Sequence, residues 1–283
     1  MMKDVSFGQY YPAESGVHRM DPRFKLVLML FYVVLIFFVD TFVGYLAYLA
    51  FVLLMTALAK VPLRTLLRSL SGVGVMVIFI SIINVFFYGG GEPLWSWWVM
   101  SVSVESILHA LKMALRIMLL VMGPALLTFT TTPTALTDGI ESLLSPLKLI
   151  KFPVRDVAVI MSIALRMIPT LMEETDRIMM AQKARGASID TGNIFRRIKA
   201  LVPVLVPLFV GAFRRAEELA FALDSRCYNA SPKRTRYRIL KPGARDAVAV
   251  LAFAAWGTFV ILSIVLFDFD TMIYNAISAA IGG

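Results

Sequence analysis

The chain has 283 residues, of which 59% are hydrophobic and 17% are charged, and its mean hydropathy is +0.77. These values exclude an ordinary soluble domain and are typical of a polytopic membrane protein. The net charge of +9 is therefore assigned to Lys and Arg on cytoplasmic loops, with no role in nucleic-acid binding. The single cysteine, Cys227, excludes a disulfide within the chain and a thiol metal cluster.

Residues 1–23 are predicted to form a cytoplasmic N-terminal segment. They lack the basic head and apolar core of a cleaved signal peptide, so we expect them to be retained. Five apolar stretches then approach the length that crosses a hydrocarbon core of about 30 Å. The predicted spans are Phe24–Val39, Phe42–Ala59, Val73–Tyr88, Ile107–Leu127 and Ala244–Phe267. The first four form a transmembrane bundle over residues 24–127, and the fifth is the last transmembrane helix at 244–267.

The positive charges predict how these spans are oriented. Basic residues precede the first span and follow the second, which places both positions in the cytoplasm. They are Lys3, Arg19, Arg23, Lys60, Arg64 and Arg68. The loop GGGEPLWSWWVMSVSVE has three tryptophans and no Lys or Arg, as expected at the outer interface. We therefore expect a cytoplasmic N-terminus and a tail, residues 268–283, on the outside.

Residues 128–243 are predicted to form cytoplasmic or interfacial helices. Leu201–Phe213 is apolar but has only thirteen residues and basic residues at both ends, so we expect it to lie along the inner face of the membrane. Val157–Met172 is interpreted in the same way, as a helix packed in protein or at the interface. Pro169, Pro203 and Pro207 are expected to kink these helices or to mark their first turns.

The sequence contains few patterns that indicate catalysis. It has no Walker loop for ATP phosphates, no GxSxG elbow, and no histidine spacing that would hold zinc. We therefore predict no catalytic residue, no metal site and no cofactor in this chain.

One stripe of ionisable residues begins just before the fourth span and continues into it. Glu105, His109, Lys112 and Arg116 are spaced by four, three and four residues, which places them on one helical face. Ionisable groups at membrane depth indicate function by default. The stripe is compatible with an embedded enzyme that acts on a lipid or phosphate substrate. Alternatively, Glu105 and His109 lie at the outer interface while Lys112 and Arg116 pair with acids or carbonyls inside the bundle.

Two helix ends share a pattern centred on arginine. In MAQKARGAS, Arg185 ends a predicted helix and Gly186 fits a left-handed C-cap. In EELAFALDSRCY, Arg226 follows forty-one residues later. An alanine lies four residues before each arginine and an aliphatic residue lies seven before it, on the same helical face. An Arg fork between small residues can enter a groove and pair with carboxylates.

Acidic residues precede the first of these ends. Glu173, Glu174 and Asp176 come early in the segment, and Lys183 and Arg185 come late. This order is expected to complement the helix dipole.

These segments resemble the transmembrane T component of energy-coupling factor transporters, a branch of ATP-binding-cassette importers. The resemblance covers most of the chain. Its segments are GQYYPAESGVHRMDPRFKL, TTTPTALTDGIESLLSPLKLIKFP, ALRMIPTLMEETDRIMMAQKARG and RRAEELAFALDSRCY. Members carry two short motifs often written Ala-Arg-Gly. Ala184, Arg185 and Gly186 match the first motif in full, whereas Ser225 and Cys227 around Arg226 depart from the second.

The resemblance implies an all-α polytopic membrane protein of about five transmembrane helices plus long coupling helices, in the plasma membrane of a prokaryote. It implies that the two arginine motifs dock into two ATPase subunits, which bind ATP and Mg. It also implies that apolar helix faces hold a separate substrate-binding S component. The residues expected at that contact are Leu201, Val204, Leu205, Leu208 and Phe209. Overall similarity favours a shared module for vitamin uptake, with a subunit dedicated to cobalt or nickel as the alternative.

Overall fold

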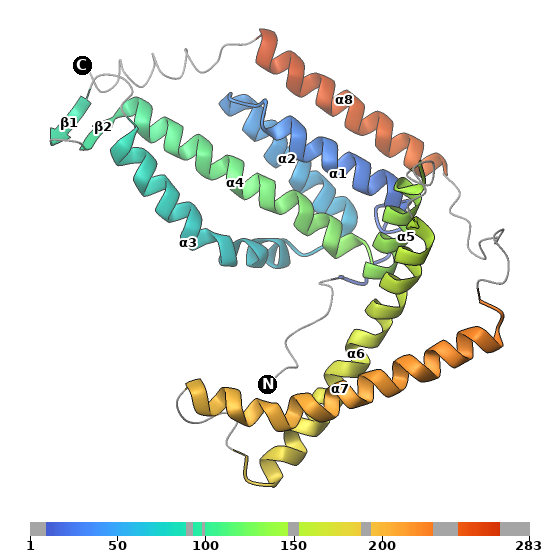
Figure 1. Ribbon diagram of the computed structural model, residues 1–283. Helices are drawn as coiled ribbons and strands as arrows, with labels where there is room; N and C mark the ends of the chain where they lie inside the picture. Colours follow the sequence, from blue (N-terminus) through green and yellow to red (C-terminus); the bar gives the residue numbers. More distant parts are fainter. Residues whose placement is uncertain are drawn as a thin grey trace. The chain divides into compact units, whose positions relative to one another are not determined.

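The computed structural model describes residues 10–88, 93–97, 100–146, 153–187, 194–228 and 243–266. The helices are α1 Pro22–Ile36, α2 Phe42–Ala59, α3 Leu63–Phe87, α4 Val104–Thr130, α5 Pro133–Leu143, α6 Val154–Ala184, α7 Ile194–Ser225 and α8 Ala244–Leu266, and the strands are β1 Pro93–Trp97 and β2 Met100–Ser103 (Figure 1). The chain forms two compact units. The bundle unit holds α1–α5, β1, β2 and α8, and the α6–α7 unit holds the other two helices.

Four helices in the described part of the chain are long and apolar enough to cross a membrane: α2, α3, α4 and α8. The first predicted span differs, because α1 has only 15 residues and is about 22 Å long. It begins at Pro22, where the Asp21 side chain accepts a hydrogen bond from the Arg23 amide and caps the helix. The structure thus provides four spans of sufficient length, and the count of five stays a prediction.

The third predicted span begins ten residues earlier than expected, at Leu63. Arg64 and Arg68, assigned above to a loop, belong to the first two turns of α3, and both are exposed. Long cationic side chains at a helix end reach the interface while their stems cover apolar surface, so they do not stop the helix. The predicted outer loop also contains structure: β1 and β2 pair antiparallel, with Trp97 opposite Met100.

Aromatic residues form the centre of the bundle unit. Trp256 of α8 stacks on Phe51 of α2 with ring centroids 4.3 Å apart, and it meets Tyr48 edge-on at 4.6 Å. Tyr32 of α1 donates a hydrogen bond to the Leu119 carbonyl of α4 at 2.9 Å. Buried hydroxyls in an apolar core need such partners, and this bond also fixes α1 against α4.

Polar contacts join the helices at the end of the bundle where α1 and α8 begin. The Asp246 carboxylate of α8 accepts hydrogen bonds from the Asp21 amide at 2.9 Å and from the Gly243 amide at 2.8 Å. Lys25 of α1 donates to the Thr130 carbonyl at 2.8 Å and to the Thr131 hydroxyl at 3.1 Å, at the end of α4. The starts of α1 and α8 and the end of α4 are therefore held together.

The helix α5 lies inside the region 128–243 that the sequence assigns to cytoplasmic helices. It packs on α1, where a Cβ added at Gly139 would stand 3.1 Å from the Pro22 side chain. Its contacts therefore place α5 in the bundle unit, and the described residues of the α6–α7 unit form the two long helices.

Candidate functional site: two matching helix ends

The helix α6 ends at the first arginine motif. Its 31 residues continue through Pro169 without a break, and Arg185 is the C-cap. Gly186 has a φ of 86°, in the left-handed region that the sequence predicts for it. The Gly186 amide donates to the Lys183 carbonyl at 2.9 Å, and the Ala187 amide donates to the Gln182 carbonyl at 3.0 Å. This pair of bonds is a Schellman motif, which satisfies carbonyls that the helix end leaves open.

The helix α7 ends in the same way at the second motif. The Cys227 amide donates to the Asp224 carbonyl at 2.9 Å, and the Tyr228 amide donates to the Leu223 carbonyl at 3.0 Å. Cys227 has a φ of 52° and takes the place of Gly186. Although the residues around Arg226 depart from Ala-Arg-Gly, its backbone follows the same course. Arg185 and Arg226 therefore occupy the same position of the same terminal motif.

The residues of both motifs are open to solvent. All six predicted docking residues are exposed: Ala184, Arg185, Gly186, Ser225, Arg226 and Cys227. Among the described residues, neither guanidinium has an ion-pair or hydrogen-bond partner. Each arginine is thus presented at a fixed helix end with its five donors free for a carboxylate or carbonyl of another molecule.

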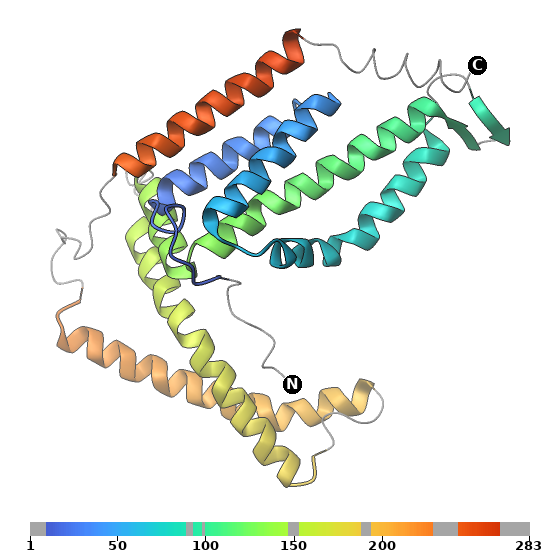
Figure 2. The same cartoon turned by 180° about the vertical axis from the view of Figure 1, so that it is seen from behind.

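The helices α6 and α7 cross (Figures 1 and 2), and an ion pair between Glu174 and Arg215 joins them. The two side chains are 28% and 34% exposed. Farther along α6, the Gln182 amide group donates to the Pro203 carbonyl of α7 at 3.5 Å. Higher residue numbers on α6 therefore meet lower numbers on α7, so the helices run antiparallel through the contact.

The ion pair is equally far along the chain from both arginines. Arg185 follows Glu174 by eleven residues, and Arg226 follows Arg215 by eleven. Eleven residues make about three helical turns, or about 16 Å, and return to nearly the same face. The sequence analysis missed this pair, although the equal spacing behind each arginine was a usable signal.

The dipole interpretation of the acidic residues on α6 is wrong. Because α6 begins at Val154, Glu173, Glu174 and Asp176 lie near its middle, far from the first turn. A helix dipole acts on charges only within the first and last turns. The structure gives Glu174 a different partner, Arg215 on the neighbouring helix.

The apolar residues predicted to contact a substrate-binding subunit lie on α7, and all but Val204 reach the surface of the helix. Leu201, Leu205 and Phe209 are 39%, 45% and 61% exposed, and Leu208 is partly buried. Val204 is only 3% exposed, so it is corrected to a packing residue. Apolar exposure on α7 is broader than predicted and includes Phe195, Ile198, Val202, Val206, Val210, Phe213 and Phe221.

The ionisable stripe of α4 makes contacts within the bundle unit. Arg116 donates to the Val39 carbonyl at 2.8 Å and to the Tyr45 hydroxyl at 2.9 Å, and it pairs with Asp40 at 2.5 Å. It therefore holds the turn between α1 and α2 against α4. These contacts agree with the structural interpretation of Arg116, the pairing with an acid and a carbonyl.

The other members of the stripe are also part of the packing. Lys112 Nζ lies 5.2 Å from the centre of the Phe42 ring, and the His109 ring stacks on Tyr88 at 4.0 Å. Glu105 lies in the first turn of α4, where a carboxylate favours the helix dipole. No group of three or more His, Cys, Asp or Glu side chains that could hold a metal occurs in the described parts of the chain.

Comparison with known proteins relates this arrangement to one family. The CbiQ family, described as cobalt transport protein, matches residues 13–237, a range that includes both arginine motifs. The chain is 46% identical over 266 residues to the energy-coupling factor transporter transmembrane protein EcfT of Acidaminococcus fermentans, with 91% of this chain and 99% of that protein covered. The protein of the same name from Ruminiclostridium cellulolyticum is 45% identical over 262 residues (93% and 98% covered). The Staphylococcus aureus protein is 44% identical over 250 residues (88% and 94% covered).

Proposed function

The chain belongs to the family of energy-coupling factor transporter transmembrane proteins, and on this premise we propose how its two helix ends serve a transporter. It is the transmembrane coupling subunit of such an importer. Arg185 docks into one ABC-type ATPase subunit and Arg226 docks into a second. The observation that carries this assignment is that both exposed arginines occupy the same place in two Schellman motifs, so two similar receptors can bind them.

In this proposal, the α6–α7 unit transmits movement between subunits. The ATPases bind ATP and Mg, and their movement displaces the two arginines. The unit passes this displacement to a substrate-binding S component that packs on exposed apolar residues of α7, including Leu205 and Phe209. The coupling chain itself supplies no catalytic residue and no cofactor.

The proposed topology follows the charge pattern. The N-terminus and the α6–α7 unit face the cytoplasm, the tail after residue 267 lies outside, and α1 completes five crossings together with the four longer helices. The protein lies in the plasma membrane of a prokaryote. This orientation places both arginine motifs on the side where ATP is available.

Two classes of cargo are considered. The first candidate, which follows the resemblance seen in the sequence, is a coupling module for vitamin uptake that serves several S components; the relatives are named energy-coupling factor transporter transmembrane proteins. The family description, cobalt transport protein, supports a second candidate, a subunit dedicated to cobalt or nickel. Mass spectrometry of the small membrane proteins that copurify with the native complex separates the two, since a shared module brings down several different ones.

The docking assignment is tested by replacing both arginines with alanine. Arg185→Ala/Arg226→Ala is expected to abolish copurification of the ATPases while membrane insertion stays intact, because the change removes charge-assisted pairs at exposed positions. Each single variant is expected to lose part of the yield. Arg214→Ala is the matched control, an exposed arginine on α7 outside both motifs. Wild-type recovery of both ATPases by the double variant would refute the assignment.

A further inference from the structure

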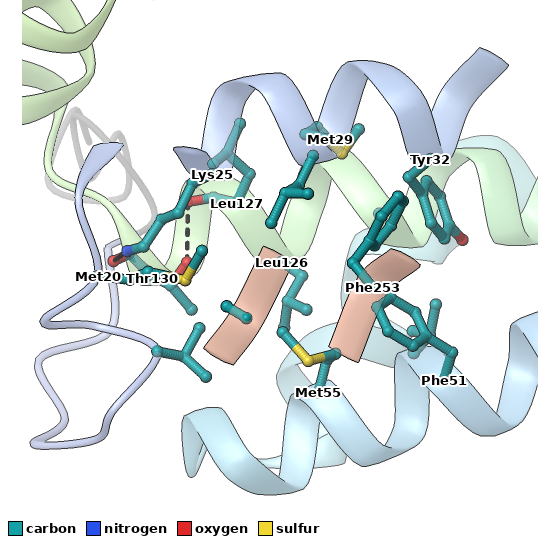
Figure 3. A pocket seen from close by; sticks show the side chains of 15 residues that line it. Met20, Lys25, Met29, Tyr32, Phe51, Met55, Leu126, Leu127, Thr130 and Phe253 are labelled. Atoms are coloured by element: carbon teal, nitrogen blue, oxygen red, sulfur yellow. Dashed lines mark hydrogen bonds between the residues drawn. The ribbon is translucent and has the colours of Figure 1, made fainter. Parts of the chain in front are cut away.

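The bundle unit contains an apolar cavity between α1, α2, α4 and α8. Its volume is about 130 Å³, and Figure 3 shows the side chains that line it. Lys25, Met20 and Thr130 lie at one end, and Tyr32, Phe51 and Phe253 lie at the other. Apolar cavities of roughly 150 Å³ stay free of water and bind small hydrocarbons. The cavity therefore suits a stretch of hydrocarbon chain. The ammonium group of Lys25 does not make it a polar site, because Thr130 and Thr131 accept its hydrogen bonds.

A second hollow in the same unit is basic. It has a volume of about 390 Å³ and lies between the N-terminal segment, the end of α2 and the start of α8. Three cationic side chains line it, from Arg19, Lys60 and Arg245, against one carboxylate, from Glu14. Glu14 is already paired with Arg19 at 3.2 Å. Lys60 and Arg245 are exposed and come from different helices, so an anion between them would neutralise both charges.

Three parts of the chain line both hollows, namely α2, α8 and the N-terminal segment, and in each of them the residues that line one hollow are neighbours of residues that line the other. On α2, Leu58 lines the basic hollow and Met55, three residues earlier, lines the cavity. On α8, Arg245 lines the basic hollow and Ala249, four residues later, lines the cavity. Residues three and four apart on a helix are direct neighbours on one face. In the N-terminal segment, Gly16 lines one hollow and the next residue, Val17, lines the other.

We propose that the two hollows together form one binding site for an anionic phospholipid. Its acyl chain enters the cavity beside Met55 and Phe253, and its phosphate lies between Lys60 and Arg245 at the membrane surface. The order of the lining residues fits this occupant, since cations stand at the helix ends and apolar side chains begin one turn deeper on both α2 and α8. Basic pockets at the ends of membrane helices bind anionic lipid headgroups. The site lies in the bundle unit and does not depend on ATPase docking.

Trp256 can report on this site, because it stacks on Phe51, which lines the cavity. The other three tryptophans, Trp95, Trp97 and Trp98, are replaced by Phe. The full chain is reconstituted into phosphatidylcholine vesicles that contain a fixed minor fraction of phosphatidylglycerol or phosphatidylcholine with brominated acyl chains, which quench tryptophan fluorescence. At this fixed fraction, the ratio of occupied to empty sites is expected to be about fivefold higher for brominated phosphatidylglycerol than for brominated phosphatidylcholine, the effect of roughly one added cation contact.

Paired variants test each half of the site. Lys60→Asn/Arg245→Gln is expected to remove the preference for phosphatidylglycerol, and Asn suits the left-handed backbone of Lys60, whose φ is 56°. Arg64→Gln/Arg68→Gln, which neutralises exposed cations of α3 outside both hollows, should keep it. Ala249→Leu fills the cavity and should lower the quenching by both brominated lipids.

Three results would overturn the proposal. They are equal quenching by the two lipids in the parent chain, a preference that survives Lys60→Asn/Arg245→Gln, and unchanged quenching in Ala249→Leu.

Discussion

Neutralising Glu174 is expected to weaken both ATPase contacts at once, although this residue lies about 16 Å along α6 from Arg185. Glu174 pairs with Arg215 where α6 and α7 cross. Without the pair, the angle between the helices is less firmly fixed, and so is the separation of Arg185 and Arg226. Two-point docking depends on that separation, because the second contact forms at an effective concentration set by the geometry of the first.

The size of the effect follows from the burial of the pair. Exposed ion pairs contribute about 0–1 kcal/mol, whereas breaking a buried pair costs about 3–5 kcal/mol. With side chains 28% and 34% exposed, the Glu174–Arg215 pair lies between these limits, at about 1–2 kcal/mol. If this energy is lost from the bound state, Glu174→Gln weakens ATPase binding roughly five- to thirtyfold. Arg215→Gln is expected to do the same, and the double variant no worse than either single one.

The assay is titration of the full chain, held in lipid nanodiscs, with fluorescently labelled ATPase subunits to obtain Kd. Glu173→Gln and Arg214→Gln are the matched controls, since each is the exposed neighbour of one partner in the pair. The reasoning is refuted if Glu174→Gln binds as tightly as Glu173→Gln. It is also refuted if the losses from Glu174→Gln and Arg215→Gln simply add in the double variant.

Two further predictions concern the helix ends and the bundle. Gly186→Ala should speed hydrogen exchange of the Ala187 amide about fivefold. The added Cβ meets nothing within 4 Å, so the expected cost is the roughly 1 kcal/mol that a side chain adds in the left-handed region. Conversely, Cys227→Gly should slow exchange at the end of α7. Arg116→Leu should lower the free energy of unfolding of the purified chain by about 2–4 kcal/mol, since Val39, Asp40 and Tyr45 each lose one donor. Arg116→Leu that kept wild-type Tm but lost transport would indicate a functional role instead.

The elements that the sequence predicts well are those bounded by abrupt changes in polarity. The helix α2 has the predicted bounds, and α8 begins at the predicted residue, because charged or polar residues stand next to uniform apolar runs. The start of α3 is missed because two arginines on an exposed helix face look the same in sequence as two arginines in a loop. The length of α1 depends on where the chain turns to let Asp40 meet Arg116, a contact across 76 residues.

In the candidate site, too, some features are predicted by the sequence and others depend on how the helices pack. The left-handed residue after Arg185 is predicted because glycine indicates it, whereas Cys227 gives no such signal at the second end. The burial of Val204 and the Glu174–Arg215 pair depend on how α6 and α7 pack, and helical periodicity alone does not specify the neighbour of each face. Sequence therefore predicts both arginines, and the structure adds the terminal motifs and the contact that joins them.

The short helix α1 also affects the surrounding lipid. The turn that follows it, at Val39, contacts Arg116, which is only twelve residues beyond the first residue of the 27-residue α4. The helix α1 is thus about 22 Å long, whereas its neighbour α4 is about 40 Å long. A bilayer with a hydrocarbon core of about 30 Å is too thick for α1. Either the bilayer thins beside α1 or the bundle tilts, and the mismatch costs fractions of a kcal/mol per Å. We expect lipids with shorter chains to collect beside α1 and the turn at Asp40, giving the protein one thin flank in the membrane.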